Sequence, residues 1–69
     1  MKRPFSIMNS AAGRKASNAY ITAKVAIEDN PCDETRAAWK AANETCRQFY
    51  AKRGMEHFAQ FHAAIVAQY

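Results

Sequence analysis

The sequence predicts an all-α protein with three helices, at about residues 10–28, 31–53 and 55–69. Alanine, the best helix former, is frequent, whereas glycine and proline occur only twice each. Apolar residues recur at spacings of three and four along each segment. Residues 1–9 are expected to form an irregular arm, because Pro4 blocks an early helix. Residues 10–69 are expected to form a single helical domain, either a small bundle or a helical hairpin that dimerisation completes.

The first helix is expected to begin after Asn9 or Ser10, both of which are suitable N-caps. At 100° per residue, Ile21 and Val25 fall on a different face from the main stripe of small and apolar residues. Two apolar faces on one helix predict two packing partners. The main stripe consists of Ala12, Ala16, Ala19, Tyr20, Ala23 and Ile27.

The second helix is marked at both ends by residues that start and stop helices. Asn30 is a candidate cap, Pro31 suits the first helical position, and Asp33 is placed to complete a capping box. Gly54 suits a left-handed cap after Lys52 and Arg53. The face expected to point toward the core holds Cys32, Trp39, Ala42, Cys46, Phe49 and Tyr50.

The third segment has a wide apolar face, which includes Phe58, Phe61, His62 and Ile65. This face is out of phase with that of the second helix, so a turn at Gly54 is expected in place of one straight rod. Ala59 is assigned to the opposite, polar face. That polar face lacks Lys and Arg, and the chain has no run of about 18 apolar residues, so no membrane association is expected.

Neither the cysteines nor the histidines form a pattern that indicates a special site. Cys32 and Cys46 on one helix would lie about 21 Å apart, too far for a disulfide. We therefore expect two reduced thiols and a cytoplasmic protein. A reactive Cys32 at a helix start is an alternative, which the neighbouring acids disfavour. His57 and His62 are five residues apart and the chain has no C-x-x-C pair, so no metal site is expected.

The sequence contains no recognisable catalytic machinery. Gly13 and Gly54 are isolated, so they do not form a phosphate-binding loop, and Asp33 and Glu34 are explained by the helix start. We identify no set of nucleophile, base and orienting group that would meet in one site. So short a helical chain also leaves little room for a substrate pocket. We expect neither an enzyme nor a bound cofactor.

The basic charge balance supports nucleic-acid binding as an alternative function. The formal net charge is +4, although four acids gather at residues 28–34. Phosphate contacts supply most non-specific affinity for DNA, but no helix-turn-helix pattern accompanies these residues. The candidate phosphate contacts are Lys2, Arg3, Arg14, Lys15, Lys40 and Arg47.

The surplus of apolar side chains predicts association with another protein. Three short helices cannot hide all of the large hydrophobic residues, and extended apolar patches usually mark interfaces. A homodimer is the commonest such assembly. We expect a small helical module that binds and modulates a larger, unidentified protein, of the kind that phages use as accessory or inhibitor proteins. Its core or interface anchors are expected to be Ile21, Val25, Trp39, Phe49, Phe58, Phe61 and Ile65.

Overall fold

The computed structural model describes residues 10–69, and this part of the chain is almost entirely helical. Its elements are α1 (Ala11–Asp29), α2 (Asp33–Lys52) and α3 (Glu56–Gln68). The predicted all-α fold with three helices is confirmed, and each predicted boundary lies within two residues of the observed one. The arm expected at residues 1–9 lies outside the described residues.

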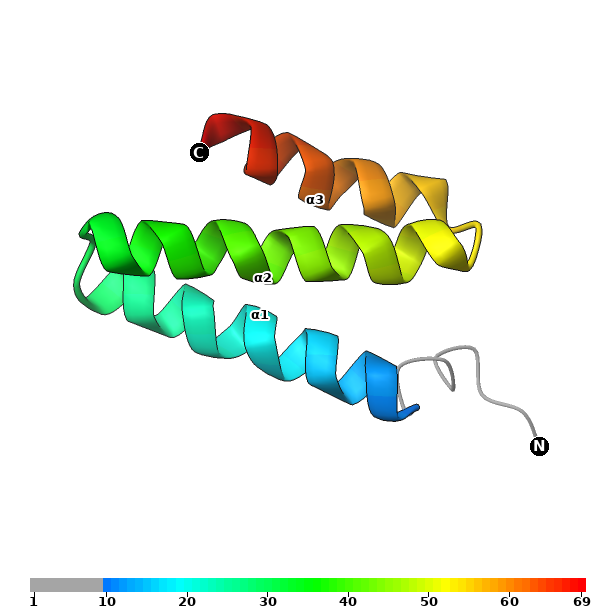
Figure 1. Cartoon of the computed structure of the whole chain (residues 1–69), viewed down its shortest axis with the longest axis horizontal. Coiled ribbons are helices and arrows are strands. Elements are labelled where there is room, and N and C mark those ends of the chain that lie inside the picture. Colours follow the sequence, from blue (N-terminus) through cyan, green and yellow to red (C-terminus); the bar gives the residue numbers. More distant parts are fainter. Residues whose placement is uncertain (1–9) are drawn as a thin grey trace.

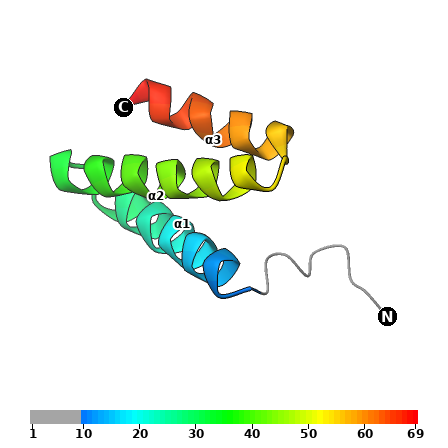
Figure 2. The same cartoon turned by 45° about the vertical axis from the view of Figure 1, so that its right-hand side comes forward.

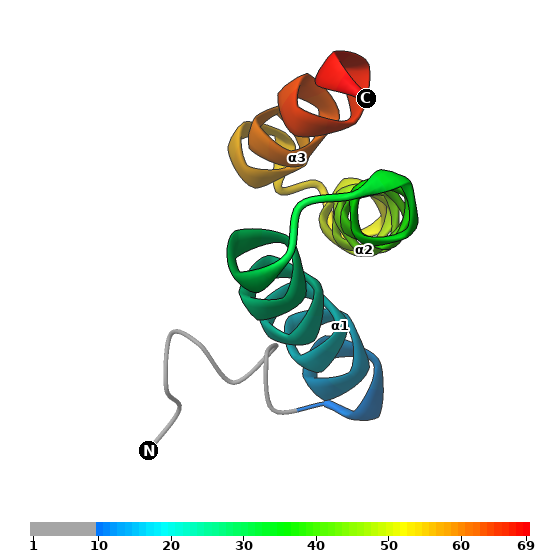
Figure 3. The ribbon, with the colours of Figure 1, turned by 90° about the vertical axis from the view of Figure 1, so that its left-hand side faces the viewer.

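Helix α2 lies between the other two helices, and both run antiparallel to it (Figure 1). Each of them packs directly against α2. Figure 2 shows that α1 crosses α2 obliquely, whereas α3 stays closer to parallel with it. Seen end-on, α1 and α3 lie on different sides of α2 and spread away from each other (Figure 3). The arrangement is therefore an open three-helix bundle.

Helix α1 is capped by a side chain at its start and packs against α2 through small residues. The Ser10 hydroxyl accepts a hydrogen bond from the Gly13 amide at 3.0 Å, so Ser10 is the predicted N-cap. Gly13, Ala16 and Ala23 are its buried residues. Their small side chains allow the backbones of α1 and α2 to approach closely. The helix ends at Asn30, which the following Pro31 keeps out of the helical region.

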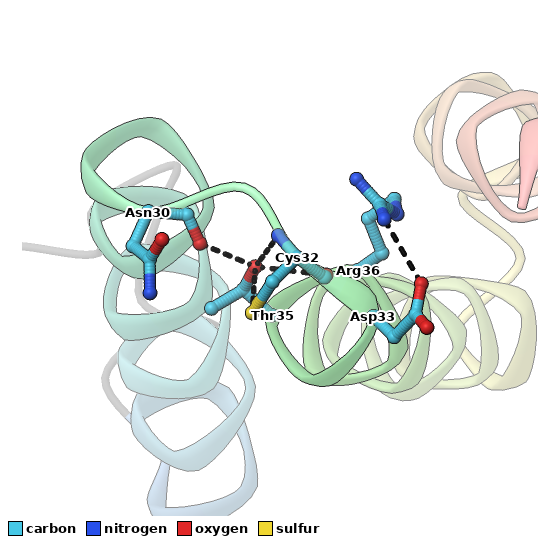
Figure 4. A network of polar contacts seen from close by, with 5 residues as sticks. All are labelled: Asn30, Cys32, Asp33, Thr35 and Arg36. Carbon is cyan, nitrogen blue, oxygen red and sulfur yellow. Dashed lines mark hydrogen bonds and ion pairs between the residues drawn. The ribbon is translucent and has the colours of Figure 1, made fainter.

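Helix α2 begins later than the sequence predicts. Cys32, not Asn30, is the N-cap, and Pro31 precedes the helix. Thr35 replaces the expected carboxylate, because its hydroxyl accepts from the Cys32 amide at 2.9 Å and donates to the Asn30 carbonyl at 2.8 Å (Figure 4). Asp33 instead pairs with Arg36 at 2.9 Å. One hydroxyl thus joins the end of α1 to the start of α2.

The predicted turn between the second and third helices is present at Gly54. Gly54 has φ of 71°, in the left-handed region that glycine adopts without strain. The Met55 amide donates to the Tyr50 carbonyl at 3.0 Å, which closes the end of α2. The chain therefore reverses here, and α3 folds back along α2.

The core forms along α2 from two adjoining clusters. Cys46 and Phe49 pack with Ala16 of α1, and Trp39 and Ala42 pack with Ala23. Tyr20 is half-buried and packs against both clusters. The predicted core face of α2 is thus largely buried.

Helix α3 packs through only part of the face expected, since His62 is buried and Ile65 half-buried as predicted. Its buried residues are Ala59 and His62, whereas Phe58 and Phe61 remain 48% and 56% exposed. Assigning Ala59 to the polar face was therefore wrong. A small residue at this position lets α3 approach α2, and a hydrogen bond that His62 donates to Asn43 sets the rotation of the helix. Phe58 and Phe61 consequently remain partly exposed, although the Phe58 ring still stacks on Tyr50 of α2.

Candidate functional site

Side chains of all three helices line a cavity of about 340 Å³. It lies where α1 and α3 diverge above α2, and we call it the aromatic groove. Most of its surface is apolar, and no acidic residue lines it. It is lined by Ala16, Ser17, Tyr20, Cys46, Tyr50, His57, Phe58, Phe61 and His62.

The aromatic rings of the groove support one another. The Tyr50 ring stacks on Phe58 with centroids 5.2 Å apart, and on His62 with centroids 5.7 Å apart. Tyr20 meets His62 edge-on at 5.4 Å and lies 5.0 Å from Trp39. Stacked and edge-on contacts of this kind are favourable for aromatic rings, so the rings of the groove wall stabilise one another.

A buried hydrogen bond holds the floor of the groove. Asn43 is fully buried, and its Nδ2 donates to the Trp39 carbonyl at 2.8 Å. Its Oδ1 therefore faces His62 Nδ1, 2.8 Å away. A carboxamide oxygen only accepts, so Nδ1 carries the proton and Nε2 of the neutral ring carries none. Burial also lowers the pKa of His62 below its ordinary value, which favours this neutral form.

The groove contains the residue types of a cysteine hydrolase, but their chemistry does not fit one. Cys46 lies in the groove with His62, and Asn43 orients the imidazole as such enzymes require. However, the Cys46 thiol lies 3.5 Å from the Ala16 carbonyl and donates to it. Burial raises its pKa, which disfavours the nucleophilic thiolate. Sequence reasoning did not consider Asn43, although a polar residue in register with Trp39 and Cys46 was the available signal.

The predicted anchors divide into two groups. Trp39 and Phe49 are buried, and Ile65 is half-buried against the cluster around Trp39. These three hold the helices together. The other four lie at the surface of the chain, which leaves them available to a partner: Ile21, Val25, Phe58 and Phe61.

The described candidate phosphate contacts do not share one surface. Lys15 borders a depression between α1 and α2, whereas Lys40 borders another beside Asp33. Arg47 pairs with Glu44, and this contact lowers the carboxyl pKa of Glu44 to about 2. Arg14 is exposed on α1. Lys2 and Arg3 lie outside the described residues.

The two cysteines differ in environment. The Thr35 hydroxyl lies 3.5 Å from Cys32 Sγ, and hydrogen bonding from Thr35 lowers the pKa of this thiol (Figure 4). The charge of Glu34 raises this pKa, in the direction expected from the sequence, but the hydrogen bonding from Thr35 outweighs it. Both thiols are free. Residues 10–69 contain no group of three metal-ligating side chains.

Comparison with protein-family models, with curated proteins and with solved structures finds no match for this chain. Among the helices described here, none is both long enough and apolar enough to cross a membrane.

His62 should make the stability of the fold depend on pH. Its pKa in the folded state is below the ordinary 6.5, so the unfolded chain binds more protons in mild acid. The free energy of unfolding should therefore fall as the pH drops below 6.5. The stabilisation of the fold by ionised Glu44 is lost only below its ordinary pKa of 4.5. The pH ranges in which His62 and Glu44 affect stability are therefore separate.

Urea unfolding of the full chain between pH 7.5 and 5 measures this dependence. His62→Gln should reduce it, while the matched control His57→Gln should retain it. If the free energy of unfolding changed with pH equally in the wild-type protein and in His62→Gln, His62 would not be the source of the pH dependence.

Cys32 should react with iodoacetamide at neutral pH at least about tenfold faster than Cys46, because thiolate fraction and access both favour it. Mass spectrometry of the two peptides measures the rates. Thr35→Val should slow the reaction of Cys32 and raise the midpoint of its pH–rate profile, whereas Thr35→Ser should preserve both. Equal reactivity of the two thiols in the folded chain would contradict the structure.

Proposed function

We propose that this protein is a non-enzymatic helical module that binds and modulates a larger protein, and that it acts as a homodimer. The aromatic groove is the observation that carries this proposal. Phe58 and Phe61 are about half exposed at its edge. Exposed aromatics beside a preformed apolar hollow are typical of the central anchors of protein interfaces.

The shape of the groove favours a helix of the partner as its occupant. Side chains of all three helices line the groove, so a helix of the partner seated on it would complete a four-helix arrangement. An amphipathic helix would insert aliphatic side chains spaced three and four residues apart. The absence of acids from the groove lining makes an apolar ridge the best-matched surface.

The chemistry of the groove supports binding over catalysis. Its thiol has a raised pKa and donates to a backbone carbonyl, and its imidazole is fixed by a structural amide. These groups stabilise the fold, and neither is poised to attack a substrate.

A pull-down with tagged protein from lysate of the producing cells, divided into nuclease-treated and untreated halves, tests the proposal. Wild-type protein should recover the same stoichiometric partner in both halves. Phe61→Asp should reduce recovery at least about tenfold, because it places a charge in a desolvated contact. Tyr69→Asp is the matched control, since Tyr69 is 45% exposed but lies outside the groove lining, and it should retain the partner.

Equal recovery by Phe61→Asp and the wild-type protein would contradict a role for the groove. Partners that disappear after nuclease treatment would indicate a nucleic-acid-binding protein instead.

A further inference from the structure

The outer face of α1 is a second apolar surface, separate from the aromatic groove. Ile21 and Val25 are 54% and 60% exposed there. Both are β-branched residues, which favour strands over exposed helix positions. Within the described chain, only α2 lies close to the backbone of α1, where it covers the face of Ala16 and Ala23, and α3 reaches α1 through the contact of His62 with Tyr20.

Charged and small residues are arranged symmetrically about Ile21 on this face. At 100° per residue, positions 14, 17, 21, 25 and 28 fall within an arc of about 80°. Their separations from Ile21 are seven and four residues in each direction. The face begins with a cation, Arg14, and ends with an anion, Glu28, at equal distances from Ile21.

We infer that this face binds a second copy of the chain, with the two α1 helices antiparallel and a twofold axis at Ile21. In that register Arg14 lies opposite the partner's Glu28, and Glu28 lies opposite the partner's Arg14. Val25 packs over the partner's Ser17, whose side chain is small. The two Ile21 side chains meet on the axis. The paired charges lie about 10 Å on either side of the axis.

Charge complementarity selects this orientation. A parallel pair of α1 helices in register would place Arg14 against the partner's Arg14 and Glu28 against the partner's Glu28, which is repulsive. Glu28 also lies 3.8 Å from Lys24 of its own helix, but its side chain remains 65% exposed and accessible to a second cation. The antiparallel register turns both ends of the face into attractive contacts.

This inference rests on the homodimer in the proposed function and names its contact surface. A dimer formed through this face of α1 leaves the aromatic groove free for another protein. Ser17 borders both surfaces, but Phe58 and Phe61 lie on α3 and belong only to the groove. Purified protein alone should therefore associate, and Phe61→Asp should leave that association unchanged. A wild-type protein that is monomeric but still captures the partner would overturn this inference and the homodimer, and would leave the role of the aromatic groove standing.

Sedimentation equilibrium of the full chain tests the register by charge reversal. Arg14→Glu and Glu28→Arg should each raise the dimer dissociation constant roughly tenfold, because each change makes two attractive pairs repulsive. An equimolar mixture of the two variants should recover the wild-type constant, since every reversed charge then faces its opposite in a heterodimer. Lys15→Glu and Asp29→Arg carry the same charge changes on other faces, and they should associate like the wild-type protein.

Ile21→Asp should abolish association while circular dichroism shows unchanged helix content. A monomeric wild-type protein, equal weakening by Lys15→Glu and Arg14→Glu, or failure of the mixture to recover affinity would each overturn the inference.

Discussion

The hydrogen bond between Asn43 and His62 is the contact on which the rest of the structure depends. It joins α2 to α3 in the interior, where an unpaired amide or imidazole would cost about 1–3 kcal/mol. Because Asn43 is also held by the Trp39 carbonyl, its oxygen can point only toward α3. The bond therefore sets the rotation of α3 as well as its position.

That rotation explains why the aromatic side chains of α3 are exposed. With His62 directed at α2, Ala59 lies in the interface, and Phe58 and Phe61 turn toward the opening beside α1. Stacking of Tyr50 on both Phe58 and His62 then ties the groove wall to the buried hydrogen bond. The polar contact thus limits the apolar burial within one chain and leaves surface for association.

The sequence predicts the helices better than the way they pack. Ser10 and Gly54 act locally, so their roles as a cap and as a turn follow from residue type. The start of α2 depends on a hydroxyl that joins two helices, which periodicity does not reveal. The division of the aromatics into core and surface depends on Asn43, because one buried amide decides which face of α3 approaches α2. The spread of the basic residues over separate surfaces likewise depends on how the helices are arranged.

The protonation state of His62 tests this account most directly. Nitrogen-15 NMR of the imidazole in the folded chain at pH 7.5 distinguishes the two neutral forms and the charged ring. The account predicts a neutral ring with its proton on Nδ1, bonded to Asn43, and an unprotonated Nε2. A neutral ring with its proton on Nε2 and none on Nδ1 would show that His62 does not donate to the Asn43 amide, and it would contradict this account.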